Sequence, residues 1–83
     1  MKVFYTQTAA RQLAELPKVL RARIADKMRF YFSTPNPFKF AEKLTDFGLY
    51  RFRVGDYRIV VEAQGVVIFV LFIKRRDKAY KNL

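Results

Sequence analysis

The chain has 83 residues, of which 52% are hydrophobic, so it can build one small core but not a second domain. We therefore treat residues 1–83 as a single domain, and the high apolar content excludes a disordered chain. Seventeen Lys and Arg against seven Asp and Glu give a formal net charge of +10, which favours an anionic partner such as nucleic acid or an acidic protein.

The first half of the chain predicts a short strand followed by two helices. Residues 2–5 (KVFY) are typical of a strand, after which Thr6 or Thr8 can cap a helix. The apolar positions of this helix share one stripe: Ala9, Leu13 and Leu16. Pro17 favours a second helix over about residues 17–32. Its apolar residues recur at four-residue spacing: Leu20, Ile24, Met28 and Phe32.

The second half predicts three strands. Two prolines within residues 33–37 end the second helix, and from Leu49 the apolar period changes to two. Turn signals at Gly55-Asp56 and Gln64-Gly65 divide the remainder into strands. These cover about residues 49–54, 57–63 and 66–73. The short turns predict an antiparallel meander.

The last predicted strand, VVIFVLFI, is apolar at every position. Such a strand is either covered on both faces or lies inside the sheet. Together the elements predict an α+β fold, in which two helices pack on one side of an antiparallel sheet.

A two-residue turn at Gly55-Asp56 sets the register of the first hairpin. It pairs Val54 with Tyr57, Arg53 with Arg58, Phe52 with Ile59 and Arg51 with Val60. One face then carries apolar residues: Phe52, Val54, Tyr57, Ile59 and Val61. The opposite face carries basic residues, with Glu62 farther along: Arg51, Arg53 and Arg58. Like charges directly opposed across strands lower the stability of the fold by up to about 1 kcal/mol. The presence of this arginine cluster therefore requires an explanation.

Two interpretations of the arginine face stay open. It is either an ordinary solvent-exposed face, where water screens the charges, or a surface that binds RNA. A second basic cluster is predicted to return to the same sheet, with Tyr80 just beyond it: Lys74, Arg75 and Arg76. Basic side chains close to aromatic rings suit RNA phosphates and unstacked bases. The basic residues of the second helix are predicted to be a plain solvent-exposed surface.

Most of the usual catalytic side chains are missing. The chain contains no His, no Cys, one Ser (Ser33) and no Gly-rich phosphate-binding loop. These absences argue against Ser-His-Asp triads, Cys nucleophiles, metal sites and cofactors. No apolar run approaches the roughly 20 residues of a membrane span. We therefore expect a cytoplasmic protein without a membrane partner, whose chemistry uses Lys, Arg and Tyr.

The order of elements and several segments resemble the RelE/ParE toxin superfamily. Lys43-Leu44 followed by LYRFRVGDYRIV at residues 49–60 is similar to the family's "KL…YR.R.GDYRI" stretch. The ending at residues 73–80 is similar to the family's basic pair followed by Tyr. This resemblance covers the whole chain and implies a RelE-like fold with a sheet like that of microbial ribonucleases. It also implies the toxin of a type II toxin-antitoxin system, with a cognate antitoxin as partner.

For the RelE-like branch, the resemblance implies an endoribonuclease that cuts messenger RNA on the ribosome and so inhibits translation. Such a toxin makes the 2′-hydroxyl attack the adjacent phosphate, without a metal or a cofactor. The catalytic residues carried over by position are Arg51, Arg53, Arg58, Arg76 and Tyr80. The implied RNA-binding residues are Lys74, Arg75 and Lys78, and Arg75 is an alternative to Arg76 in the catalytic role.

Two departures from the family pattern bear on the mechanism. Arg51 and Arg53 stand where the best-known members have Lys, and Arg hardly accepts a proton; the C-terminal His of some members is also absent. We therefore assign Arg53, Arg58 and Arg76 to stabilising the dianionic phosphorane. Tyr80 would stack on a base, orient it, or donate a proton. Two alternatives stay open: a ParE-like inhibitor of DNA gyrase without nuclease activity, and a nucleic-acid-binding member without catalysis.

Overall fold

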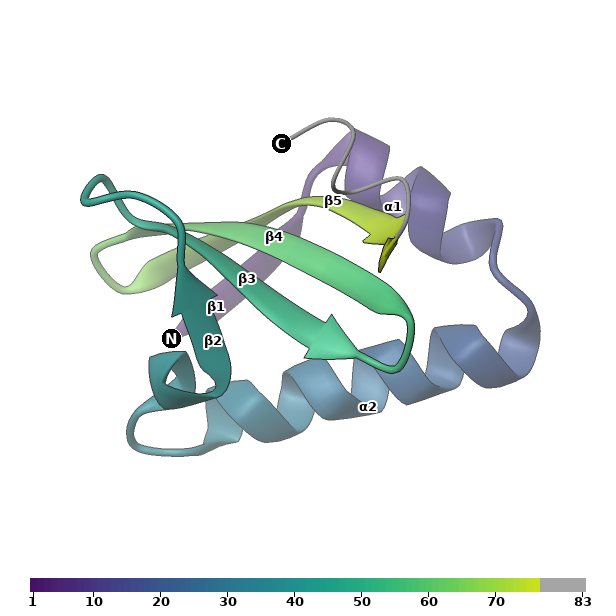
Figure 1. Ribbon diagram of the computed structural model, residues 1–83, viewed down its shortest axis with the longest axis horizontal. Coiled ribbons are helices and arrows are strands. Elements are labelled where there is room, and N and C mark those ends of the chain that lie inside the picture. Colours follow the sequence, from purple (N-terminus) through teal and green to yellow (C-terminus); the bar gives the residue numbers. More distant parts are fainter. Residues whose placement is uncertain (77–83) are drawn as a thin grey trace.

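The computed structural model describes residues 1–76 of the chain. In chain order its elements are β1 (Lys2–Tyr5), α1 (Gln7–Ala14), α2 (Lys18–Ser33), the 3₁₀ helix η1 (Pro37–Phe40), β2 (Ala41–Lys43), β3 (Leu49–Val54), β4 (Tyr57–Gln64) and β5 (Val67–Arg75). The strands form one sheet in the order β1-β5-β4-β3-β2, with β1 parallel to β5 and the other pairs antiparallel. Figure 1 shows α2 running alongside this twisted sheet. The predicted α+β class and the meander of β3, β4 and β5 are confirmed.

Both helices begin and end close to the predicted residues. The Oγ1 atom of Thr6 accepts a hydrogen bond from the amide of Ala9 at 3.1 Å, so Thr6 is the cap of α1. Pro17 is the N-cap of α2 rather than its first residue, and α2 ends at Ser33, ahead of the two prolines. The predicted stripes face the sheet, since Ala9, Ile24 and Met28 are buried.

The outer edge of β5 is covered first by β1 and then by Thr6 and Gln12, two side chains of the segment that follows β1. The strand β1 pairs with β5 only as far as Val70. Beyond that point the Thr6 hydroxyl donates to the Leu71 carbonyl at 2.9 Å, and the Ile73 amide donates to Gln12 Oε1 at 2.6 Å. The strand β5 therefore lies inside the sheet, between β1 and β4, which explains its uniformly apolar sequence.

Three details of the sheet differ from the prediction. The second turn is Gly65-Val66 instead of Gln64-Gly65, because Gln64 pairs with Val67. Gly65 has a φ of +60°, and Gly55 has +59° at the same position of the first turn, where a two-residue hairpin favours glycine. In addition β5 continues to Arg75, and the short elements η1 and β2 had not been predicted.

The core centres on Phe52, which is fully buried. Its ring lies 5.2 Å from Tyr31, 5.4 Å from Phe32 and 6.5 Å from Phe38, measured between ring centroids. The buried apolar cluster draws on both helices and one face of the sheet: Ala9, Ile24, Met28, Phe52, Val54, Ile59, Val61, Ile68, Val70 and Ile73. The opposite face of the sheet is thereby left to the predicted arginines.

Replacing Phe52 by Ala should lower the free energy of unfolding by about 3–5 kcal/mol, because the cavity forfeits contacts with three rings. That loss is a large share of the roughly 5–15 kcal/mol of a typical domain. Urea unfolding followed by circular dichroism measures it. The control Phe47→Ala removes a side chain that is 88% exposed and should change stability by less than about 0.5 kcal/mol. Equal stabilities of the two variants would contradict the assigned core.

Candidate nucleic-acid interface

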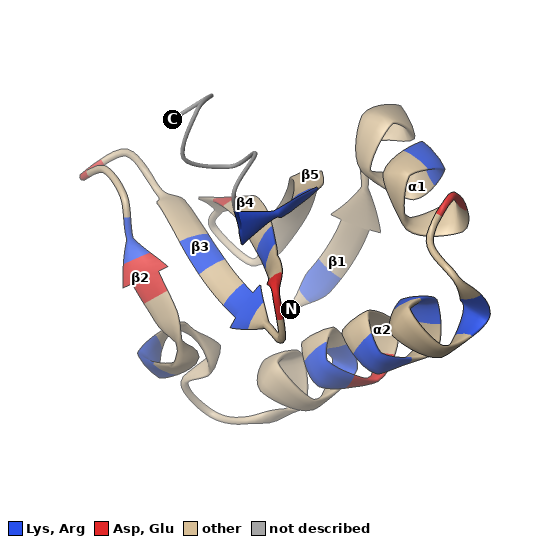
Figure 2. Ribbon diagram, turned by 45° about the vertical axis from the view of Figure 1, so that its right-hand side comes forward, with Lys and Arg blue, Asp and Glu red and all other residues tan. Residues whose placement is uncertain are grey.

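Three positively charged residues lie side by side on neighbouring strands, on the face of the sheet that points away from the core. Arg53 on β3 pairs with Arg58 on β4, and Arg58 pairs with Lys74 on β5. We call these three residues the cation row. Residues directly opposite in a sheet have Cβ atoms roughly 5 Å apart, so the row concentrates three positive charges in a short span. Figure 2 shows the basic positions of β3, β4 and β5 close to one another.

Two arginines of this face are buried, and the interpretation as an ordinary solvent-exposed surface is wrong for them. Arg58 is only 3% exposed and Arg51 only 8%, and Val60 beside Arg51 is buried as well. Both arginines lie on strands that have a neighbour on each side. The side chain of Arg53 is 58% exposed. A buried guanidinium costs solvation free energy, so this face needs compensating negative charge.

Glu42 supplies part of that charge. It pairs with Arg51 across β2 and β3, and Arg51 Nη2 donates a hydrogen bond to Glu42 Oε2 at 2.8 Å. The same oxygen lies 3.7 Å from Arg53 Nη2. The hydrogen bond from Arg51, followed by the charge of Arg51 and then those of Arg53 and Arg58, lowers the pKa of the Glu42 carboxyl. Glu42 is therefore ionised at neutral pH and holds Arg51 in place.

Sequence reasoning missed Glu42 because β2 has only three residues and shows no periodicity of its own. A usable signal was the polar segment TDFG at residues 45–48, directly before β3. Such a segment predicts a reversal of the chain, and hence an antiparallel partner strand on its N-terminal side. That reversal brings Glu42 opposite Arg51.

The second basic cluster divides between the two faces of the sheet. Lys74 joins the cation row, and its Nζ atom lies 5.4 Å from the centre of the Phe72 ring. Arg75 pairs with Tyr57 and lines a hollow on the helix side, together with Leu20 and Ile24. The predicted return to the arginine face therefore holds for Lys74 and not for Arg75, because the two-residue alternation of β5 continues through Arg75.

Arg76 is exposed and follows β5 directly. Its backbone amide donates to the carbonyl of Asp56 at 2.7 Å, which ties it to the turn between β3 and β4. Of the two candidates for the C-terminal role, Arg75 is the one that lines the hollow on the helix side. The predicted residues Lys78 and Tyr80 lie outside the described part of the chain.

A second hollow, of about 520 Å³, lies on the helix side between β1, α1 and α2. Its lining is largely apolar: Met1, Val3, Tyr5, Leu13, Ala25, Met28, Arg29, Phe32 and Ser33. Burial raises the pKa of Tyr5, and the nearby charge of Arg29 lowers it to a smaller extent. With a single charged side chain, this hollow offers little chemistry compared with the cation row.

The cation row suits a phosphate group. Arginine presents a planar fork of donors that matches phosphate oxygens, and neighbouring cations raise the local positive potential. Within residues 1–76 there is no group of three or more His, Cys, Asp and Glu that could hold a metal ion. No helix in that range is both long and apolar enough to cross a membrane.

These features define a small basic α+β protein that carries a row of three cations on the face of its sheet that points away from the apolar core. Residues 3–80 match the family described as "ParE toxin of type II toxin-antitoxin system, parDE". The chain belongs to this family, within the RelE/ParE toxin superfamily. A comparison with curated protein sequences gave no match.

Solved structures of toxin-antitoxin complexes share the fold. The RelB-RelE antitoxin-toxin complex from Methanococcus jannaschii matches with a TM-score of 0.76 and 25% identity, over 96% of this chain and 98% of that chain. The archaeal RelE-RelB complex from Pyrococcus horikoshii matches with a TM-score of 0.71 and 29% identity, over 90% and 93%. The chromosomal ParDE system from P. aeruginosa, 16% identical with a TM-score of 0.70 over 90% and 95%, shows the fold alone.

Replacing Glu42 by Gln should lower stability at neutral pH and make less difference in acid. The pKa of Glu42 is lowered in the folded state, so its stabilising effect is fully present above the ordinary value of 4.5. This effect is lost as the pH falls through the lowered folded pKa. Urea midpoints of both proteins at pH 7 and about pH 2 measure the difference. A difference that is equal at the two pH values would contradict the proposed ion pair.

Proposed function

We propose that this toxin cuts messenger RNA on the ribosome by promoting attack of a 2′-hydroxyl on the adjacent phosphate. This attack forms a 2′,3′-cyclic phosphate and breaks the bond to the 5′-oxygen; the 2′-hydroxyl proton passes to water, and the leaving 5′-oxygen takes up a proton. The observation that carries the proposal is the cation row, in which Arg53, Arg58 and Lys74 lie in register on one face. The attack places two negative charges on the phosphorane oxygens. Donors fixed in advance around those oxygens stabilise the transition state more than they stabilise the substrate.

The burial of Arg58 supports this role. A side chain that is only 3% exposed is already ordered, so little reorganisation is needed when charge develops on the phosphate. Arg53 is more exposed and able to reach a ligand from the solvent side. Glu42 holds Arg51 beside them through a hydrogen bond. Arg58 is therefore fixed before a ligand binds, whereas Arg53 can adjust its position.

The arginines do not accept the 2′-hydroxyl proton, which passes to water. Arg stays protonated at neutral pH and cannot act as a general base. Glu42 is ionised, yet its lowered pKa makes it a weak base and its oxygen is engaged by Arg51. We therefore keep Glu42 as the residue that positions Arg51. For Tyr80 and Arg76 we keep the roles that the family resemblance implies, with Tyr80 stacking on a base or donating a proton to the leaving 5′-oxygen.

We also propose a cognate antitoxin as protein partner. The similar solved structures from M. jannaschii and P. horikoshii are complexes of a toxin with its antitoxin. A net charge of +10 independently favours an acidic partner, whose binding would neutralise the surface used for RNA.

Inhibition of DNA gyrase is the second candidate function, because the matching family is described as the ParE toxin of parDE systems. The two functions differ in a direct assay. Purified toxin should cleave messenger RNA when ribosomes are present and leave gyrase supercoiling unchanged. Inhibition of supercoiling without RNA cleavage would establish the second candidate, and neither activity would leave a nucleic-acid-binding protein without catalysis.

Binding to single-stranded RNA should weaken steeply with salt. Two phosphate contacts, from Arg53 and Lys74, predict a slope of about −1.4 in log affinity against log salt concentration, because Arg58 is buried and single strands release roughly 0.7 counterions per contact. Affinity should therefore fall about sevenfold between roughly 50 and 200 mM salt. Fluorescence anisotropy with a short labelled RNA measures the slope. A flat response would mean that the positive charge serves the protein partner only.

Replacing Arg58 by Met or Arg76 by Ala should abolish growth inhibition when the toxin is induced in cells. The loss of one preorganised donor costs on the order of a hundredfold to a thousandfold in rate. Met keeps most of the volume of the buried Arg58 chain. The controls Arg21→Ala and Arg29→Ala change helix residues outside the cation row and should remain toxic.

Each variant must first unfold cooperatively in urea, because a misfolded toxin also loses activity. If folded Arg58 and Arg76 variants inhibit growth as strongly as the original protein, RNA cleavage by this site is excluded. Gyrase inhibition would then be the better account.

A further inference from the structure

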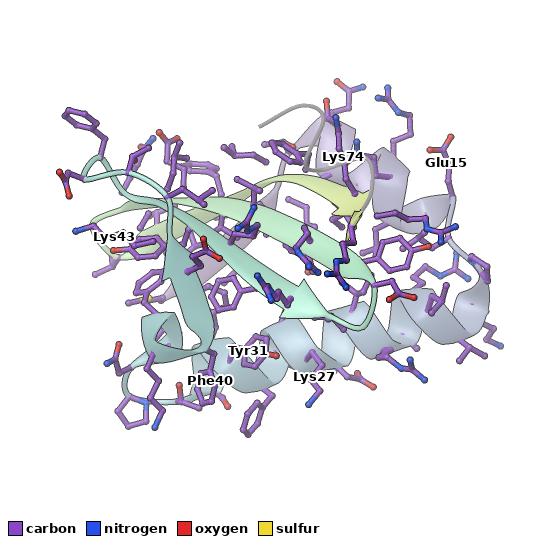
Figure 3. All side chains as sticks on the ribbon, in the orientation of Figure 1. Glu15, Lys27, Tyr31, Phe40, Lys43 and Lys74 are labelled. Carbon is purple, nitrogen blue, oxygen red and sulfur yellow. The ribbon has the colours of Figure 1, made fainter. Side chains whose placement is uncertain are left out.

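Three aromatic side chains form a cluster where α2 meets η1, and two of them are exposed. The ring of Phe40 lies 5.8 Å from Phe30 and 5.0 Å from Tyr31, and Phe30 lies 5.9 Å from Tyr31. We call Phe30, Tyr31 and Phe40 the aromatic corner. Phe30 is 53% and Phe40 38% exposed. Figure 3 shows Tyr31 and Phe40 close together beside α2. Clustered exposed rings of this kind mark binding sites.

The aromatic corner continues the cation row. Ala41 pairs with Phe52 across β2 and β3, and Phe40 directly precedes Ala41 at the end of η1. Phe40 therefore lies toward the end of β3 that carries Arg53. A second link comes from α2, where the Tyr31 hydroxyl donates to the backbone carbonyl of Arg53 at 3.5 Å. A ligand that lies along the row would therefore meet the rings next.

The charges around the corner are mainly positive. The Nζ atom of Lys39 lies 5.2 Å from the centre of the Phe40 ring. On α2, a shallow hollow of about 370 Å³ brings Phe30 together with Arg23, Asp26 and Lys27. Asp26, the acidic member, is engaged by Arg29 at 2.8 Å. The surroundings thus suit a ligand that alternates flat apolar parts with negative charge.

We propose that the aromatic corner is a stacking platform for one unpaired base of the RNA strand whose phosphates lie on the cation row. This inference rests on the proposed function and adds a subsite to it. Every base offers a flat face to an aromatic ring, so such stacking does not depend on which base is present. Lys39 and Lys27 would then face the phosphates on either side of the stacked base. The exposed cation-π contact of Lys39 with Phe40 is weak enough for a base to displace.

An apolar segment of a protein partner fits the same surface less well. It would cover Phe30 and Phe40 but would also strip water from the lysines that flank them, without supplying negative charge. A nucleotide supplies both the flat ring and the charge. The experiment below separates these two occupants.

The test measures binding of the full chain to a set of short RNA oligomers, each with one abasic position. All carry 2′-O-methyl groups, which prevent cleavage by 2′-hydroxyl attack. For the original protein, one abasic position should lower affinity about fivefold to a hundredfold, the range that a single stacked base accounts for. Phe40→Leu keeps an apolar side chain but removes the ring face, and should cause a similar loss with intact RNA. In that variant the same abasic position should cost no further affinity.

Two matched control variants accompany these binding measurements. Phe47→Leu changes an aromatic residue that is 88% exposed on another loop and should bind every oligomer as the original protein does. Lys27→Gln should weaken binding and reduce the salt slope by about 0.7, whereas Phe40→Leu should leave the slope unchanged. Phe47→Leu and Lys27→Gln should keep the urea midpoint of the original protein, because these side chains are exposed. Phe40→Leu should lower it only slightly, since Leu keeps an apolar contact with Tyr31.

The outcomes are distinguishable. If Phe30→Leu and Phe40→Leu bind every oligomer as tightly as the original protein, while binding stays salt-dependent, the stacking platform is excluded and the proposed function stands. If these variants lose affinity for the antitoxin alone, the corner is a protein-docking surface and the inference is wrong. If the original protein binds no RNA, the proposed function itself fails.

Discussion

The register of the hairpin between β3 and β4 is the constraint on which the rest of the structure depends. The turn at Gly55 places Val54 opposite Tyr57, and successive residues then point to alternate faces. A slip of one residue would turn Phe52 toward solvent and bring Arg53 and its neighbours into the apolar core. The core and the cation row are thus two consequences of one pairing, and the free energy of burying Phe52 holds the arginines in place.

Electrostatics then connects this arrangement with function. Pairing Arg53 with Arg58 opposes like charges, and burying Arg58 adds a cost in solvation. Glu42 offsets part of that cost through its hydrogen bond with Arg51. Under the proposed function, a phosphate would add further negative charge to this face. Donors fixed in this way would suit a ligand that develops negative charge during the proposed reaction.

Tyr31 joins the core to both surfaces. Its ring stacks on Phe52 inside and on Phe40 at the rim, and its hydroxyl donates to the carbonyl of Arg53. The 3₁₀ helix η1 carries Phe40 to this position and leads directly into β2, which carries Glu42. The short elements between α2 and β3 therefore do more than connect the layers. They set both the counter-charge and the aromatic end of the arginine face.

The sequence by itself determined the two helices, the meander and the pairing of Arg53 with Arg58, because periodicity and tight turns are local properties. The family resemblance identified the superfamily through the GDYR stretch. Only the tertiary structure decided that Arg51 and Arg58 are buried, that Glu42 binds Arg51, and which face Arg75 takes. These features depend on contacts between segments far apart in the chain, namely β2 against β3 and the end of β5 against β4. No spacing within one segment encodes such a contact, since it forms only when the whole core packs.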